Sequence, residues 1–204
     1  MEAKKKIAVL VSGGGTNLQA LIDSIARGEI RSAEIACVIS NKADAYALER
    51  AKKAGIPAKA ITKDFAKEAL SYMQECGVEY IVLAGFLSII GQDILSAYKN
   101  KIINIHPSLI PSFCGKGYYG LHVHEKVLEY GVKLTGATVH FVSEEVDGGV
   151  IIQQKAVEVR HDDTPEILQK RVMEEAEWVI LPRAVELVCG GHVTIKGRMA
   201  VIEE

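Results

Sequence analysis

Short apolar runs alternate with segments of helical pattern along the first hundred residues of the chain. Each run is continuously apolar, as is typical of a strand that is buried on both faces. We predict strands at residues 7–11, 35–39, 58–61, 80–84 and 102–105, and helices between them at residues 18–26, 45–54, 65–75 and 92–98. Strands that are separated by single helices join through right-handed crossovers into a parallel sheet. Ligands of such a sheet bind beyond the carboxyl ends of its strands.

Two longer β-rich segments distinguish the second half of the chain. Residues 137–142 and 150–159 predict antiparallel strands, and residues 121–129 predict a helix that Gly131 closes. No stretch of linker composition separates the two halves, so we predict one compact domain over residues 1–204. The predicted fold class is α/β: a Rossmann-like parallel sheet with helices on both faces and antiparallel strands in the C-terminal half.

The C-terminal segment predicts one long helix followed by a hairpin. The helix covers residues 165–188, and Asp163 or Thr164 is its expected capping residue. The hairpin is HVTIKGRMAVI (192–202), and we place its turn at Lys196-Gly197.

Charge and cysteine spacing exclude several classes of protein. The formal net charge is -2, which gives no basic surface for nucleic acid or for an anionic membrane. No apolar stretch is long enough to span a bilayer. We therefore expect small-molecule partners, no nucleic acid and no membrane. The cysteines are far apart and form no C-x-x-C pair, so we predict free thiols in a reducing compartment, the cytoplasm.

A glycine loop, SGGGTN (12–17), lies between the first strand and the first helix. Glycines let the backbone approach an anion closely, and the free N–H groups and the helix dipole favour phosphate there. A plain tight turn with Thr16 or Asn17 as the helix cap is the alternative. No Gly-Lys-Ser/Thr follows, so this is not a Walker loop. Leu18 replaces the third glycine of a dinucleotide fingerprint, and Ser40-Asn41 stand where its carboxylate belongs, so a monophosphate is the better ligand.

Three polar residues indicate acid–base chemistry at the carboxyl edge of the sheet. Asn104 and His106 are two positions apart at the end of a strand, so both side chains point to the same side. An amide can donate to the oxyanion that forms when a carbonyl is attacked, and an imidazole can donate or relay a proton. A carboxylate near the imidazole would raise its pKa, and Asp147 in an Asp-Gly-Gly turn is the candidate.

Each of these residues also has a purely structural interpretation. Asn104 and His106 could form a satisfied polar pair at a strand end, and Asp-Gly is an ordinary turn signal. His122 and His124 lack partners at ligand spacing, so we predict no metal site and a structural or solvated role for both. The residues alone therefore indicate a phosphate site and an acid–base site in an α/β protein, with these alternatives open.

Seven segments, spread in order between residues 12 and 182, carry a family resemblance. They are SGGGTNLQALID (12–23), SNKADAYALERA (40–51), LAGFLSII (83–90), NIHPSLIPSF (104–113), GLHVHEKVL (120–128), TGATVHFVSEEVDGGVIIQQ (135–154) and EWVILP (177–182). They resemble the folate-dependent glycinamide ribonucleotide formyltransferases. Asn-x-His-Pro-Ser with a later Asp-Gly-Gly marks the wider formyltransferase superfamily, and SGGGTN and SNKADA are more specific to the glycinamide ribonucleotide branch.

The resemblance implies transfer of a formyl group from 10-formyltetrahydrofolate, a co-substrate, to the amine of 5-phosphoribosylglycinamide. The implied products are N-formylglycinamide ribonucleotide and tetrahydrofolate, in de novo purine (IMP) biosynthesis. The resemblance also implies a formyltransferase fold with a phosphate-binding half at about residues 1–100 and a folate-binding, catalytic half at about 101–204.

The resemblance assigns site residues by their positions. Asn104 would bind the formyl oxygen, His106 would donate a proton, and Asp147 would keep His106 protonated or oriented. The substrate phosphate would contact Gly15, Thr16 and Asn17, and the amine end of that substrate would contact Glu177 or Glu174. The folate site would comprise Lys67, Leu87, Ser88, Ile89, Ile90, Asn104, Ser143, Glu144, Glu145, Val146 and Asp147.

Three features depart from the family pattern. Ser88 stands where relatives often have arginine, and the segment 61–66 is short, which weakens Lys67 as a contact for the folate tail. The loop of residues 112–120 carries the insertion CGKGYYG, whose glycines suggest a mobile cover over the site. A tolerated surface insertion is the alternative for that loop.

Other functions stay open on the sequence alone. They are a formyltransferase that acts on a sugar-nucleotide amine, and a catalytically silent module that binds folate or nucleotide. A tRNA substrate is disfavoured because the chain has neither the length nor the basic charge for it. We expect a monomer or a homodimer, and the sequence does not decide between them or fix the order of substrate binding.

Overall fold

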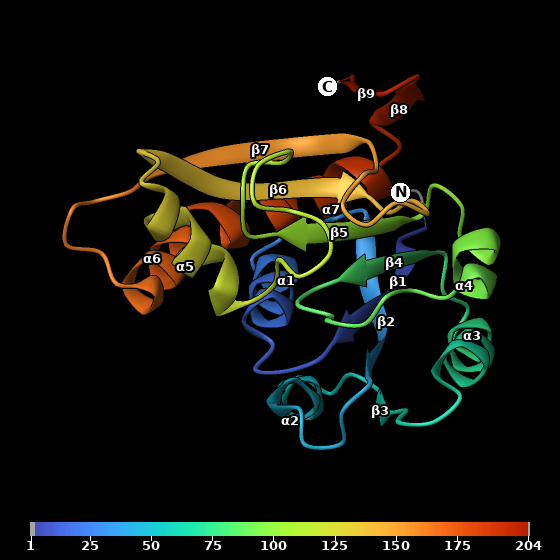
Figure 1. Cartoon of the computed structure of the whole chain (residues 1–204). Helices are drawn as coiled ribbons and strands as arrows, with labels where there is room; N and C mark the ends of the chain where they lie inside the picture. Colours follow the sequence, from blue (N-terminus) through green and yellow to red (C-terminus); the bar gives the residue numbers. More distant parts are fainter. Residues whose placement is uncertain (1–2, 204) are drawn as a thin grey trace.

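The sheet has the predicted α/β architecture. A computed structural model describes residues 3–203, so residues 1, 2 and 204 of the predicted domain lie outside it (Figure 1). Within the described residues, seven strands form one sheet in the order β3-β2-β1-β4-β5-β6-β7. The strands β1 to β5 are parallel, and β6 pairs antiparallel with both β5 and β7. Their bounds are β1 (Lys5–Val11), β2 (Ala33–Ser40), β3 (Ala58–Ala60), β4 (Tyr80–Leu83), β5 (Ile102–His106), β6 (Leu134–Phe141) and β7 (Ile151–Glu158). The predicted fold class is confirmed.

Helices cover both faces of this sheet (Figure 1). Alternate residues of β1 show the two layers: Ile7, Val9 and Val11 pack with α1, α5 and α7, whereas Ala8 and Leu10 pack with α3 and α4. Because both sets are fully buried, β1 has the continuously apolar sequence of a central strand. The helices are α1 (Thr16–Ala26), α2 (Tyr46–Lys53), α3 (Phe65–Glu75), α4 (Gln92–Ala97), α5 (Leu121–Tyr130), α6 (Pro165–Val172) and α7 (Trp178–Cys189).

The long helix that we predicted over residues 165–188 is not regular. A π-helical turn, η1 (Met173–Glu177), separates α6 from α7. The helical segment is continuous from Pro165 to Cys189, as predicted, and the π turn within it is a local departure that the apolar pattern did not predict. The turn lies beside α1, where the side chain of Asn17 contacts Glu177.

Local contacts identify the capping residue of the long helix and the turn residues of the hairpin. Thr164 is the cap, and its hydroxyl accepts the N–H of Ile167 at 3.3 Å. In the hairpin of β8 (Val193–Lys196) and β9 (Met199–Ile202), Lys196 pairs with Met199. The turn residues are therefore Gly197-Arg198, one position later than predicted. Gly197 has φ of 63°, which suits the first central position of a tight hairpin turn.

The carboxyl edge of the parallel strands holds the main cavity. The start of α1 and the loops that follow β4, β5 and β6 enclose a volume of about 440 Å³. This is the place where a parallel sheet binds ligands, and the alternation of strands and helices predicted it. No helix among residues 3–203 is both long and apolar enough to cross a bilayer.

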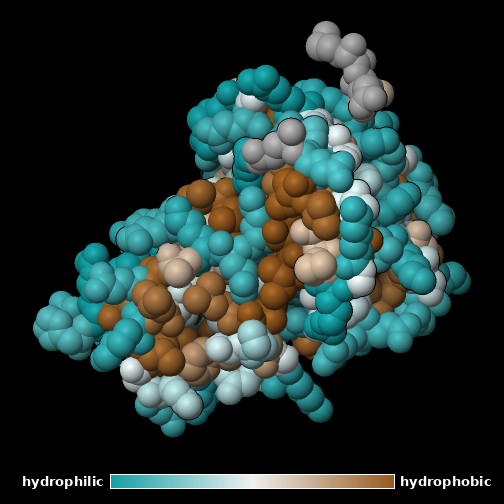
Figure 2. All heavy atoms as spheres, turned by 90° about the horizontal axis from the view of Figure 1, so that it is seen from above, coloured by the Kyte–Doolittle hydropathy of each residue, from teal (hydrophilic) through white to brown (hydrophobic). Residues whose placement is uncertain are grey.

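Both apolar and charged side chains are exposed near the edge strand β7. Seen from above, the molecule carries apolar patches that are surrounded by hydrophilic residues (Figure 2). Met199 and Ile202 of β9 are among its exposed apolar side chains. On β7 itself, Lys155 and Glu158 are exposed, and charges on an edge strand oppose its pairing with another sheet.

Candidate active site

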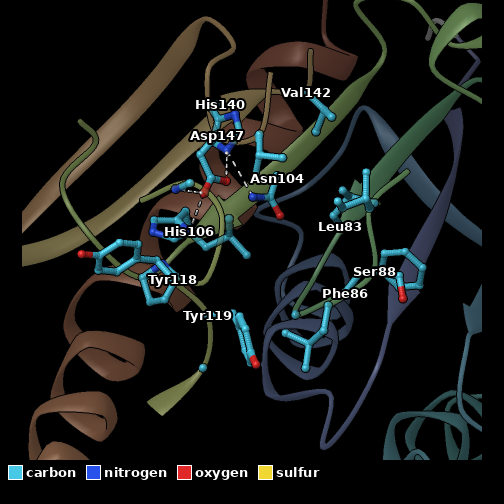
Figure 3. A pocket seen from close by; sticks show the side chains of 18 of the residues that line it. Leu83, Phe86, Ser88, Asn104, His106, Tyr118, Tyr119, His140, Val142 and Asp147 are labelled. Atoms are coloured by element: carbon cyan, nitrogen blue, oxygen red, sulfur yellow. Dashed lines mark hydrogen bonds and ion pairs between the residues drawn. The ribbon is translucent and has the colours of Figure 1, made fainter. Parts of the chain in front are cut away.

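Asn104 and His106 point together from the end of β5 into the cavity (Figure 3). They lie on one face because they are two residues apart in a strand. On the neighbouring strand β6, His140 pairs with Asn104, and the amide Nδ2 lies 3.1 Å from the imidazole Nε2. The other ring nitrogen of His140 lies 2.9 Å from the carbonyl oxygen of Phe141, which can only accept. His140 Nδ1 therefore carries a proton, and at most one of the two amide N–H groups of Asn104 is directed at His140, which leaves the second for a ligand.

The Asp147 carboxylate lies between two imidazole rings (Figure 3). Its Oδ2 is 3.5 Å from His106 Nδ1, and its Oδ1 is 3.6 Å from His140 Nε2. The backbone N–H of Gly115 donates to Oδ2 at 2.8 Å. The turn needs glycine after it, because a Cβ on Gly149 would lie 1.7 Å from the carbonyl oxygen of Phe141. The residues that we predicted to converge, Asn104, His106 and Asp147, thus lie together.

Burial and contacts act in opposite directions on the two titrating groups. Burial raises the pKa of Asp147, but the contacts with His140, His106 and Gly115 outweigh it, so the pKa is lowered and the carboxylate stays charged. The pKa of His106 is lowered, because its burial outweighs the attraction of Asp147. We expected the carboxylate to raise this pKa. Its contribution has that sign but does not decide the net direction.

The ring of His106 is nevertheless arranged to hold a proton. Its Nε2 lies 2.9 Å from the carbonyl oxygen of Phe113, and its Nδ1 faces the Asp147 carboxylate. Both ring nitrogens therefore face acceptors, an arrangement that suits the protonated ring. A ring whose two nitrogens face acceptors, and whose pKa burial lowers, is well placed to give up a proton.

The loop of residues 112–120 is part of the site. It supplies the Phe113 carbonyl to His106 and the Gly115 N–H to Asp147. Two tyrosines of the loop, Tyr118 and Tyr119, line the cavity. These contacts argue against a surface insertion without a role. Cys114 points away from this chemistry, since its thiol donates to the carbonyl of Pro111 and burial raises its pKa.

The glycine loop is held by α2. The N–H of Ala47 donates to the carbonyl of Gly13 at 3.0 Å, and Arg50 Nε donates to the carbonyl of Gly14 at 2.7 Å. Gly15, with φ of 72°, is the residue before α1. A Cβ on Gly15 would lie 2.6 Å from the Cβ of Ala47, so only glycine fits. The first N–H groups of α1 have no side-chain cap in the described structure, as a phosphate site at this helix end requires.

Next to this loop lies a second buried carboxyl, that of Glu177. Its Oε2 accepts from Asn17 Nδ2 at 2.6 Å, and both side chains line the cavity. Burial raises the pKa of Glu177 to about 7. Asn17 Oδ1 is buried and has no hydrogen-bond partner among residues 3–203. These groups are suited to contact a polar substrate between the glycine loop and His106.

The other predicted contacts separate into two groups. The cavity is lined by Thr16, Leu87, Ser88, Ile89, Ile90, Ser143, Glu144, Glu145 and Val146. It is not lined by Gly15, Lys67 or Glu174. Lys67 is exposed on α3, and the side chain of Glu174 lies 3.8 Å from Lys170 on the outer side of η1. The structure therefore brings Glu177 to the cavity, and does not bring Glu174 or Lys67 there.

His124 lies in the cavity, although the sequence predicted only a structural or solvated role for it. His124 on α5 is fully buried, lines the cavity and has no partner for either ring nitrogen among the described residues. Burial, with the nearby His106, lowers its pKa to about 4, so the ring is neutral. The helical period of α5 could have placed His124 on the buried face with Val123 and Val127. The backbone groups of Phe113 and Gly115 leave no such signal. His122, in contrast, is exposed and pairs with Glu125.

Comparison with protein families and curated proteins gives consistent matches. The formyl transferase family matches residues 5–185. The phosphoribosylglycinamide formyltransferase of Haemophilus influenzae is 43% identical over 206 residues, which cover 98% of this chain and 94% of that protein. The trifunctional purine biosynthetic protein adenosine-3 of Gallus gallus is 46% identical over 94% of this chain. The chain spans only 19% of that longer protein.

Among solved structures, one bacterial protein has nearly the same fold. The crystal structure of glycinamide ribonucleotide transformylase 1 from Symbiobacterium toebii matches with a TM-score of 0.92 and 41% identity. The match covers 98% of this chain and 95% of that one. The sheet and the loops around the cavity therefore belong to a shared architecture.

Gly15→Ala is expected to destabilise the protein by about 2 kcal/mol, because alanine is strained at this φ and its Cβ meets Ala47. Urea unfolding measures the change. Gly14→Ala is the matched control, since a Cβ there has nothing within 4 Å. Equal stability of the two variants would contradict the packing that we describe.

Glu177→Gln is expected to remove a pH dependence of stability. The carboxyl has a pKa of about 7 in the folded protein against 4.5 for the free side chain, so the unfolded chain loses the proton first. This group therefore costs the wild type about 3 kcal/mol of unfolding free energy as the pH rises from the lower value to the higher one. Urea unfolding measures the free energy of unfolding across this pH range. This free energy should depend less on pH in Glu177→Gln than in the wild type, and Glu177→Gln alone should show the change. Glu174→Gln, on the exposed side of η1, is the control, and an identical response of both variants would contradict the assignment.

Proposed function

Because the chain belongs to the formyl transferase family, we propose that it transfers a formyl group from 10-formyltetrahydrofolate to the amine of 5-phosphoribosylglycinamide. The products would be N-formylglycinamide ribonucleotide and tetrahydrofolate, in de novo purine biosynthesis. The names of its Haemophilus and Gallus relatives support this substrate and this pathway. The observation that carries the proposal is the meeting of Asn104, His106 and Asp147 in a cavity that also reaches the glycine-loop helix.

The two ends of the cavity suit the two substrates. The N–H groups at the start of α1 would bind the phosphate, with Gly15, Thr16 and Asn17 around it. The amine end of that substrate would lie near Glu177. The pteridine ring would lie against Leu87, Ile89 and Ile90, because these side chains make that wall of the cavity apolar. The remaining contacts would come from residues 143–147.

The reaction needs no nucleophile from the protein. The substrate amine attacks the formyl carbon, a new C–N bond forms, and the carbonyl oxygen becomes an oxyanion. The free amide N–H of Asn104 would donate to this oxyanion. The oxyanion then re-forms the carbonyl, the C–N bond to the folate nitrogen breaks, and His106 donates a proton to that nitrogen. The proton that the attacking amine loses would return to the His106 ring, directly or through water.

Asp147 would stabilise the charged ring of His106 during this transfer. Its carboxylate stays ionised because three groups contact it, and it faces Nδ1 of the ring. The tyrosines and backbone of the 112–120 loop would limit access of water, which competes with the amine for the formyl carbon.

The proposal includes the compartment and the oligomeric state of the enzyme. We propose a cytoplasmic protein, active as a monomer or a homodimer, that acts on small molecules and uses no metal. All four cysteines are free thiols, as a reducing compartment would keep them.

A direct assay tests the activity. Purified protein with 10-formyltetrahydrofolate and 5-phosphoribosylglycinamide should release tetrahydrofolate, followed by absorbance, whereas sugar-nucleotide amines should not serve. His106→Ala should fold normally and lower kcat by about a thousandfold, because it removes the proton donor. Absence of turnover by the wild type would contradict the proposed function. Near-normal turnover by the variant would remove His106 from the mechanism.

Asp147→Asn is expected to move the alkaline limb of the pH–rate profile toward lower pH. The carboxylate raises the pKa of His106, so its removal lowers that pKa further. Activity that needs the protonated ring is then lost at a lower pH as the pH rises. Measurement of kcat against pH checks this, and an unmoved limb would separate Asp147 from His106 in the mechanism.

A further inference from the structure

A chain of hydrogen bonds joins the glycine loop to the loop of residues 85–90. Ser12, at the start of the glycine loop, is only 3% exposed. Its hydroxyl accepts the N–H of Leu87 at 2.9 Å and donates to Asn41 Oδ1 at 2.8 Å. The amide Nδ2 of Asn41 then donates to the hydroxyl of Ser88 at 2.7 Å. Three segments that are far apart in sequence are therefore tied at one point.

Asn41 is the central member of this chain. It follows β2 directly, so the sheet fixes its backbone next to the end of β1. Its amide uses both ends, because the oxygen accepts from Ser12 and the nitrogen donates to Ser88. A hydrocarbon side chain of similar size could make neither bond.

The loop that receives these bonds needs support. Leu87 and Ile89 are 51% and 79% exposed, so packing does little to hold their part of the loop. Phe86 and Ile90 are buried and anchor it at the two sides. Figure 3 shows Phe86 and Ser88 on the side of the cavity opposite His106 and Asp147. The Ser12 N–H also donates to the carbonyl of Gly85 at 3.1 Å, at the start of the loop. In its exposed middle part, the wall is held through Leu87 N–H and Ser88, the two groups that Ser12 and Asn41 contact.

We propose that Asn41 is a positioning residue that, through Ser12 and Ser88, holds the loop of residues 85–90 in place for the reduced folate. The inference rests on the proposed function, because it takes this wall as the folate site. It predicts an effect on folate and not on the nucleotide. The glycine loop keeps its own supports, the Ala47 N–H and the Arg50 side chain, when Asn41 is changed.

Asn41→Leu is the main test. We expect the KM for 10-formyltetrahydrofolate to rise about tenfold, with the KM for the nucleotide and kcat within about twofold of the wild type. Ser88→Ala, which removes one bond of the chain, should raise the folate KM about threefold. The double variant should be no worse than Asn41→Leu alone, because the two side chains act through one bond. Lys42→Ala, next in sequence and exposed, is the control and should behave as the wild type.

A direct binding measurement distinguishes the proposed function from the positioning role of Asn41. Tetrahydrofolate is titrated into each protein by calorimetry without nucleotide. If the wild type binds no tetrahydrofolate, the proposed function fails. If the wild type binds it and Asn41→Leu binds it equally well, the positioning role alone is overturned. A rise in both KM values, with a lowered Tm for Asn41→Leu and an unchanged folate KM for Ser88→Ala, would also overturn it, since that pattern marks a general structural role.

Discussion

The site depends on one buried charge, the carboxylate of Asp147. A carboxylate in a protein interior is costly unless several donors surround it. Here two imidazole rings and a backbone N–H contact it, and they come from β5, β6 and the loop of residues 112–120. Satisfying this charge therefore requires the sheet register, the turn after β6 and the loop to be in place together. The catalytic geometry follows from this electrostatic demand.

Most of the fold could be predicted because its sequence signals are local. A strand that is buried on both faces, such as β1, must be apolar throughout, and the helices between such strands end at Gly55 or Gly77 in the left-handed conformation. The π turn at Met173–Glu177 left no comparable signal. It depends on how α7 packs against α1, and Asn17 and Glu177 meet there across 160 residues of sequence.

Residues that act through their side chains could be predicted from the sequence, whereas residues that act through backbone atoms could not. The period of a strand places Asn104 and His106 on one face, whereas Asp147 was a candidate by its residue type and only the family resemblance assigned it to the same site. The contacts of Phe113 and Gly115 come from backbone atoms, which any residue carries, so no sequence pattern could show them. Asn41 was noted only as the residue that stands where a dinucleotide-binding protein has a carboxylate. Its two hydrogen bonds depend on loops that pair only in three dimensions.

The two buried carboxyls of the cavity show how environment assigns different roles to the same group. Asp147 has contacts with three donors, and its pKa is lowered. Glu177 is more deeply buried and has one hydrogen bond, from Asn17, so its pKa is raised to about 7. One end of the cavity therefore holds a fixed negative charge that stabilises a protonated imidazole. The other end holds a carboxyl that can be neutral or charged near neutral pH, beside an amide oxygen that still lacks a donor. A substrate with a phosphate, hydroxyls and an amine can supply that donor, whereas the apolar wall of residues 87–90 cannot. Under the proposed function, the nucleotide would therefore enter the end of the cavity that holds Glu177, and the folate would enter the end with the apolar wall.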